Sequence, residues 1–135
     1  MDSNESKDNK KASGKVVLCL AAITLAGIDG EFKQEELEQL RSLAGGDDRV
    51  LNDAMEIYSW LPTSECIKIV SNSLTDKQKR VAFKFLYQYS HHDNESRHSE
   101  QLLLQQYGDT FGFDEQTMKE LIQEGLKPEE LHIFN

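Results

Sequence analysis

The chain has 135 residues, 38% of them hydrophobic, and a formal net charge of −9 at pH 7. This length is enough for one domain with a real core. The acidic balance argues against a nucleic-acid partner, whose phosphates require a basic patch, and favours cations or basic proteins as partners.

Hydrophobic periodicity predicts helices along nearly the whole chain. Residues 1–12 are polar and charged, so we expect a disordered tail there. Apolar residues at helical spacing follow. The predicted helices span residues 13–28, 33–44, 48–60, 64–71, 76–91, 97–108 and 115–125, and one more turn is expected near the C-terminus. Candidate N-cap residues precede four of them: Asp47 or Asp48, Thr63 or Ser64, Thr75 with Gln78 as a capping box, and Asp114.

No segment shows the sustained alternation of a half-buried strand. The sequence therefore predicts an all-α fold, a compact bundle of about seven helices in a single domain over residues 13–135. The helix over 13–28 is apolar around most of its circumference, which predicts a central position in the bundle. Its apolar stretch of about 13 residues is too short to span a bilayer. It also lacks a clear signal cleavage site, so we expect a cytoplasmic protein without membrane insertion.

Several side chains are expected in the core. Cys19 and Cys66 are flanked by apolar residues and are interpreted as reduced core residues, with a disulfide between them as the alternative. Trp60 lies in an apolar cluster with neighbouring residues that is typical of core, although an exposed Trp there would mark a partner surface. In the helix over 97–108, three side chains are expected to point inward and two glycines to end the element: Leu102, Leu103 and Tyr107, then Gly108 and Gly112.

Two acidic turns share one pattern. In each, an Asp follows an apolar helix, and a Glu occupies the first turn of the next helix seven residues later. The two copies are 64 positions apart. Since both occur at the same place in the order of elements, we predict a bundle built from two pseudo-repeated halves. The alignment pairs Asp29 with Asp93, Glu31 with Glu95 and Glu36 with Glu100.

The first copy, residues 20–32 with Glu36, resembles the signature of the TerB-like family, named for the tellurite-resistance protein TerB. That signature is an apolar helix ending in Ala-x-x-Asp-Gly, then an apolar residue, then Glu. The second copy departs from it, with Asn94 in place of Gly and Ser96 in place of the apolar residue. The resemblance implies a non-enzymatic stress-response binding or scaffolding domain. It also implies protein partners, including membrane-associated ones, and a divalent cation held by acidic residues.

The acidic turns also indicate a metal site on chemical grounds. Carboxylate oxygens suit hard cations. An EF-hand is excluded, because Leu25 and Gly27 occupy the loop positions that should supply side-chain oxygens. If the halves face each other, both acidic turns converge on one cation. The candidate ligands are Asp29, Glu31, Glu36, Asp93, Glu95 and Glu100. Ca²⁺, Mg²⁺ or Mn²⁺ is expected, with Zn²⁺ as the second choice if His91, His92 or His98 takes part.

Two alternatives remain open. An Asp before Gly is a common turn residue, and a Glu in a first helical turn is favoured by the helix dipole alone. In that case the protein is a metal-free acidic helical module that binds a basic partner. The other alternative is a carboxylate-bridged di-metal enzyme, whose Glu-x-x-His motif occurs only as Glu95 to His98. With no nucleophile–base pair in the sequence, we expect no enzyme.

Overall fold

The computed structural model describes residues 14–28, 34–91 and 98–134, and these residues form seven α-helices and one 3₁₀ helix without a β-strand. The predicted all-α bundle is thereby confirmed. Its elements are α2 (Gly14–Gly27), α3 (Gln34–Leu43), α4 (Asp48–Trp60), α5 (Thr63–Ser73), α6 (Asp76–Ser90), α7 (His98–Thr110), α8 (Glu115–Glu124) and η1 (Pro128–Phe134).

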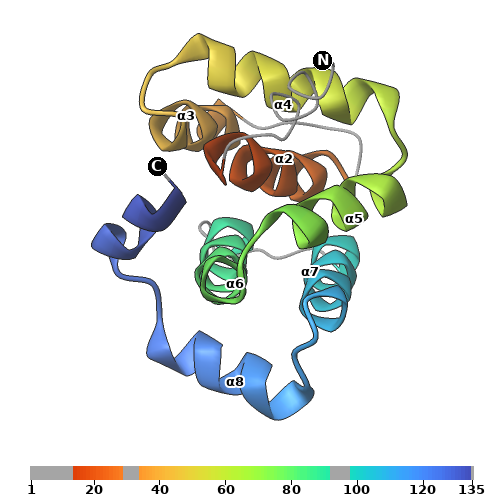
Figure 1. Cartoon of the computed structure of the whole chain (residues 1–135), viewed down its shortest axis with the longest axis vertical. Coiled ribbons are helices and arrows are strands. Elements are labelled where there is room, and N and C mark those ends of the chain that lie inside the picture. The colour runs from red at the N-terminus through yellow and green to blue at the C-terminus, as the bar shows by residue number, and fades with distance from the viewer. Residues whose placement is uncertain (1–13, 29–33, 92–97, 135) are drawn as a thin grey trace, which may run out of the picture.

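Helix α2 is the central element. Every residue from Val16 to Ala26 is buried, as the apolar circumference of this helix predicts. In Figure 1, α2 lies between α4 and α3 on one side and α6 and α7 on the other. Helix α8 packs on α6 at the far end of the molecule from α4. Because α2 has no solvent-facing stripe, all the other elements except α8 pack around it.

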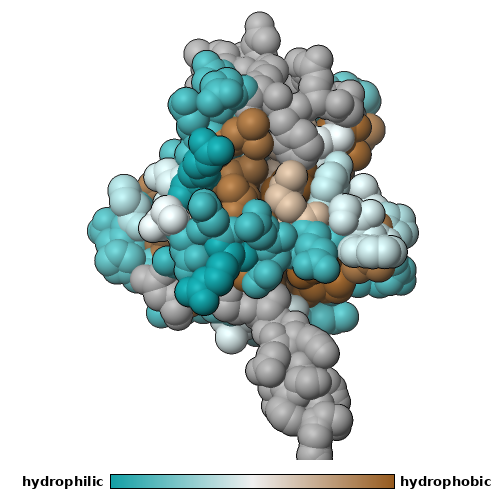
Figure 2. All heavy atoms as spheres, turned by 90° about the horizontal axis from the view of Figure 1, so that it is seen from above, coloured by the Kyte–Doolittle hydropathy of each residue, from teal (hydrophilic) through white to brown (hydrophobic). Residues whose placement is uncertain are grey.

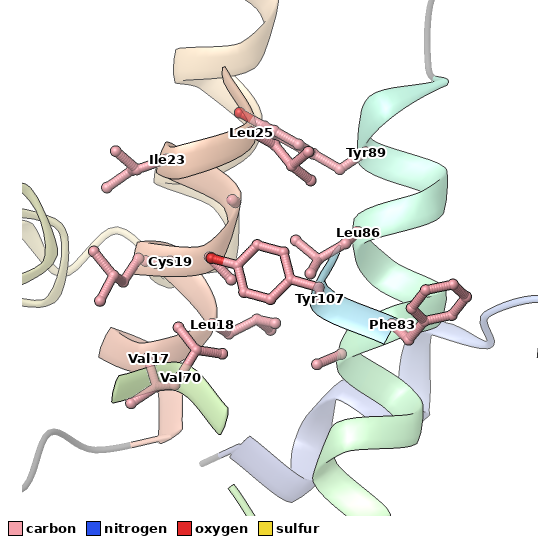
Figure 3. Packing of buried hydrophobic residues seen from close by; sticks show 14 of the residues in the cluster. Val17, Leu18, Cys19, Ile23, Leu25, Val70, Phe83, Leu86, Tyr89 and Tyr107 are labelled. Carbon is pink, nitrogen blue, oxygen red and sulfur yellow. The ribbon is translucent and has the colours of Figure 1, made fainter. Parts of the chain in front are cut away.

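The described residues on the face of the bundle that carries α3 and α4 are largely polar. Figure 2, seen from the side that carries α3 and α4, shows hydrophilic residues over much of this face and a band of apolar residues exposed between them. The exposed residues of α3 include Glu35, Glu38 and Arg41. The core beneath joins side chains from all eight elements into one cluster, part of which is drawn in Figure 3.

Local hydrogen bonds fix several helix starts as predicted. Asp47 caps α4 by accepting from the Arg49 backbone N–H at 2.9 Å. Thr75 and Gln78 form both hydrogen bonds of the predicted capping box at the start of α6. Asp114 caps α8 by accepting from the Thr117 backbone N–H at 2.8 Å. This hydrogen bonding with Thr117 lowers the pKa of the Asp114 carboxyl.

The start of α5 was predicted wrongly. Neither Thr63 nor Ser64 caps it; Thr63 is already helical, and Pro62 occupies the N-cap position without a side-chain hydrogen bond. The Pro62 carbonyl accepts from the backbone N–H groups of Glu65 and Cys66. Because the fixed φ of proline suits a helix start, the chain turns directly from α4 into α5 without a hydroxyl cap.

The inward face of α7 also differs from the prediction. Leu102 is 55% exposed, and the helix continues past Gly108 to Thr110. The buried residues follow the i, i+3, i+4, i+7, i+8 pattern of one helical face: Glu100, Leu103, Leu104, Tyr107 and Gly108. A side chain has no room at Gly108, because a Cβ there would lie 3.1 Å from Phe83 Cε1 and closer still to Met118. Gly108 allows close packing instead of ending the element.

The C-terminal segment closes the side of the bundle. Phe134 at the end of η1 is buried, and the Ile133 carbonyl accepts from Gln78 Nε2 at 2.9 Å. Lys84 of α6, whose side chain is 5% exposed, donates to Glu124 at 2.9 Å and to Glu130 at 3.0 Å. Burial lowers the pKa of the Lys84 ammonium, but the hydrogen bonds and charges of the two carboxylates outweigh burial and raise it.

Both cysteines are free and buried, as predicted, and the alternative disulfide is not formed. Burial raises the pKa of the Cys19 thiol to about 11 and also raises that of Cys66. Such thiols stay protonated near neutral pH and act as small core residues. The predicted tail, residues 1–12, lies outside the described residues.

Candidate metal site

Two of the predicted ligands, Glu36 and Glu100, are buried. Glu36 in the first turn of α3 is 6% exposed and Glu100 in the first turn of α7 is 7% exposed, while their neighbours Glu35 and Gln101 face water. Each of the two residues has an interaction partner. Since a carboxylate loses its hydration when it is buried, two such groups in corresponding helix positions indicate a specific role.

Tyr89 is the buried side chain that relates to both glutamates, through a hydrogen bond to the backbone of Glu36 and through the charge of each carboxylate. It lies in the last turn of α6, is 3% exposed, and donates from its hydroxyl to the Glu36 backbone carbonyl at 3.2 Å. Burial raises the pKa of its phenol, and the negative charges of Glu36 and Glu100, with that of Cys19 once its thiol ionises at high pH, raise it further. Charges act this way at short range in a low-dielectric interior. Glu36 and Glu100 therefore both lie in the neighbourhood of one phenol.

Figure 3 shows how Tyr89 reaches this position. Its side chain crosses from α6 toward α2, and its hydroxyl ends beside Leu25 near the C-terminal end of α2. Leu25 is fully buried. Helices α2 and α6, which precede the two acidic turns in the sequence, pack on each other, and Tyr89 links α6 to α3 by its hydrogen bond.

Four of the six predicted ligands lie outside the described residues: Asp29, Glu31, Asp93 and Glu95. In the described part of the chain, no three His, Cys, Asp or Glu side chains gather as a metal-binding group. The structure thus brings the Glu members of the two turns toward Tyr89, and the convergence of all the carboxylates stays a prediction. The pseudo-repeat of the two halves also stays a prediction. The starts of α3 and α7 are 64 residues apart, which is the spacing of the two Asp residues.

The histidines proposed as zinc ligands take different positions. His91 ends α6 and stacks on Tyr87, with 4.2 Å between ring centroids. Its Nδ1 is 2.8 Å from the Tyr87 carbonyl and 3.0 Å from Ser90 Oγ. One ring nitrogen of His91 is therefore occupied by hydrogen bonds. His98 is exposed at the start of α7, and His92 lies outside the described residues.

Sequence reasoning missed Tyr89 and the burial of the two glutamates. A signal was present in the spacing: Glu36 precedes the buried Leu40 by four residues, and Glu100 precedes the buried Leu104 by four. Residues four apart share a helix face, so each Glu was already on the inward side. Tyr89 lies among the buried apolar residues of α6, and its polar contact is with α3, so no local pattern identifies it.

The comparisons with family models, curated proteins and solved structures return no match for the chain. The TerB-like resemblance accordingly rests on the residues of the first acidic turn alone. None of the described helices combines the length and apolar content needed to cross a lipid bilayer.

Proposed function

We propose that this protein is a non-enzymatic, stress-response-type binding or scaffolding domain that resembles the TerB-like family and binds a divalent cation at its two acidic turns. The observation that carries this proposal is the burial of Glu36 and Glu100 on two different helices around Tyr89. The acidic turns containing Asp29 and Asp93 directly precede these helices in the sequence.

The electrostatics of the two glutamates favour a cation. Both carboxylates have lost most of their contact with water, and a bound cation would offset that loss. A hard cation such as Ca²⁺, Mg²⁺ or Mn²⁺ prefers carboxylate oxygens. Glu36 and Glu100 would hold it together with Asp29, Glu31, Asp93 and Glu95. Zn²⁺ is the second choice, because the candidate ligands are carboxylates, and the hydrogen bonds at Nδ1 leave only Nε2 of His91 for a metal.

A cation at this position would tie α3 to α7. Helix α3 packs on α2 and α4, and α7 packs on α6, α5 and α2, so a shared cation adds a direct link between the N-terminal ends of α3 and α7. We infer that cation binding stabilises one arrangement of the surface presented to a protein partner, in the cytoplasm and including membrane-associated partners.

The test is thermal unfolding with and without millimolar Ca²⁺, Mg²⁺ or Mn²⁺ in the chelator-treated protein. A cation at one hundred times its Kd stabilises the folded state by about 2.7 kcal/mol, which raises Tm by several degrees. Asp29→Asn with Glu36→Gln should abolish the increase. The matched control is Glu35→Gln with Glu38→Gln, which removes two exposed charges from α3 and should leave the increase intact.

The second candidate is a metal-free acidic module that docks a basic partner. It is favoured by the position of Glu36 and Glu100 in first helical turns, where the helix dipole stabilises a carboxylate without any metal. Under this alternative, Glu36→Gln lowers Tm by the same amount with or without added cation, and no cation raises the Tm of the unsubstituted protein.

A further inference from the structure

The single tryptophan of the chain is exposed. Trp60 is the last residue of α4 and is 77% exposed, contrary to the core position that its apolar neighbours indicated. The inward face of α4 consists of Ala54 with partly buried aliphatic residues and Tyr58, and Trp60 is outside that cluster. An exposed indole of this size is typical of residues that anchor a protein partner.

Two carboxylates accompany Trp60 on the same side of α4. Glu56 is one turn earlier and Asp53 two turns earlier, and both are exposed. Residues at these spacings line one face of a helix. Neither carboxylate pairs with a lysine or arginine in the part of the chain that the structure describes. This face of α4, which we call the Trp60 face, therefore combines a large aromatic surface with two carboxylates. Arg49 lies one turn before Asp53, at the far end of this face from Trp60, and pairs with Asp47.

We propose that the Trp60 face docks a basic, arginine-bearing segment of a partner protein. An arginine guanidinium can stack on an indole and also pair with a carboxylate, and both groups are offered here within two helical turns. Charge complementarity selects this occupant. An anionic membrane or a nucleic acid is repelled by the carboxylates, and a second copy of this chain carries the same net charge of −9.

The Trp60 face is distinct from the proposed metal site. None of the six predicted ligands lies in α4 or α5, and the inward face of α4 packs mainly on α2. Docking at this face thus goes beyond the proposed cation binding and does not require a cation. Measuring it in the presence of EDTA separates a failure of this inference from a failure of the metal site.

Intrinsic fluorescence offers a direct assay, because Trp60 is the only tryptophan. The probes are a nona-arginine peptide and a nona-lysine peptide, titrated at low salt with EDTA present. We expect a saturable change in tryptophan emission and tighter binding of the arginine peptide. In anisotropy measurements with labelled nona-arginine, Trp60→Ala and the double variant Asp53→Asn with Glu56→Gln should each weaken binding about tenfold.

Two controls match these variants. Leu102→Ala removes an exposed apolar side chain from α7, and Glu115→Gln with Glu120→Gln removes two exposed charges from α8. Both should bind the arginine peptide as the unsubstituted protein does. An equal loss in the α8 double variant, equal affinity for the two peptides, or Trp60-dependent self-association in sedimentation would each overturn the inference.

Discussion

The buried ion pairs of Lys84 give the sharpest prediction about stability. The Lys84 ammonium comes from α6 and is enclosed, while Glu124 at the end of α8 is 62% exposed and Glu130 of η1 is 29% exposed. The three charged groups therefore differ in hydration: the ammonium is shielded from water, whereas each carboxylate is still partly exposed to it. Removing the carboxylates and removing the lysine should have different costs.

The double variant Glu124→Gln with Glu130→Gln leaves a buried ammonium without an opposite charge. Loss of a buried ion-pair partner costs about 3 kcal/mol of unfolding free energy. Lys84→Met instead leaves two carboxylates that can turn toward water, and a buried apolar chain of similar volume costs about 1 kcal/mol or less. Glu124→Gln alone should cost about 0.5 kcal/mol, because this carboxylate is mostly exposed.

The assay is urea denaturation followed by far-UV circular dichroism, which does not depend on the exposed tryptophan. The predicted order of destabilisation places the double carboxylate variant first, well above Lys84→Met, with Glu124→Gln last. Triple substitution, Lys84→Met added to the double variant, should recover most of the loss. If Lys84→Met is the most damaging change, or if the triple variant is no more stable than the double, the reasoning from unequal burial is wrong.

Two further predictions concern buried hydroxyls and pH. Thr24 donates to the Ala21 carbonyl at 2.7 Å, so the Tyr107 hydroxyl, also at 2.7 Å, donates to Thr24 Oγ1. Thr24→Val should then lower the unfolding free energy by about 2 kcal/mol, and adding Tyr107→Phe should restore part of it in thermal unfolding, since the unsatisfied donor is gone. The folded state raises the pKa of Lys84, so the stability that Lys84 contributes is full below its unfolded pKa and is lost as the pH rises above about 10.5. The pKa of Glu130 is lowered, first by the Lys127 backbone N–H and then by Lys84. The stability that Glu130 contributes is therefore lost as the pH falls below about 4.5. The difference in Tm between the unsubstituted protein and Lys84→Met should therefore shrink at both ends of the pH range, and a constant difference would contradict it.

Local features of the fold could be predicted because their causes lie within a few residues. The capping box of Thr75 and Gln78 closes over three positions, and Asp114 caps the helix that begins at the next residue. The burial of α2 follows from an apolar circumference, which leaves no other stable position for this helix. For the caps, one short segment contains both the hydrogen-bond donor and the acceptor. For α2, one segment contains the whole apolar surface that becomes buried.

Features that depend on other elements could not be predicted. Leu102 was expected inward because it is apolar, but Leu104 occupies the inward face, set by the packing of α7 on α5 and α6. Trp60 faces water because α4 ends there and the chain leaves for α5. Lys84 is enclosed by partners 40 and 46 residues later, which no local pattern shows.

The sequence identified candidate ligands, and it did not show the surroundings of the two that the structure describes. The spacing of the acidic turns identified Glu36 and Glu100, and the structure brings both toward Tyr89. Their burial followed from helical spacing to Leu40 and Leu104, which was overlooked because Glu is usually exposed. The contact with Tyr89 depends on how α3 and α6 pack, and only the fold shows it.

The most direct test of the proposed site is a Mn²⁺ titration of the ¹⁵N-labelled protein followed by NMR. A paramagnetic cation held by the two acidic turns should broaden the amide signals at the starts of α3 and α7 and at Tyr89 with substoichiometric Mn²⁺. Signals from α4, α5 and the exposed face of α8 should stay sharp, and an excess of Mg²⁺ or Ca²⁺ should reverse the broadening. Uniform weak broadening over all exposed acidic residues, with Tyr89 unaffected, would contradict a shared cation site.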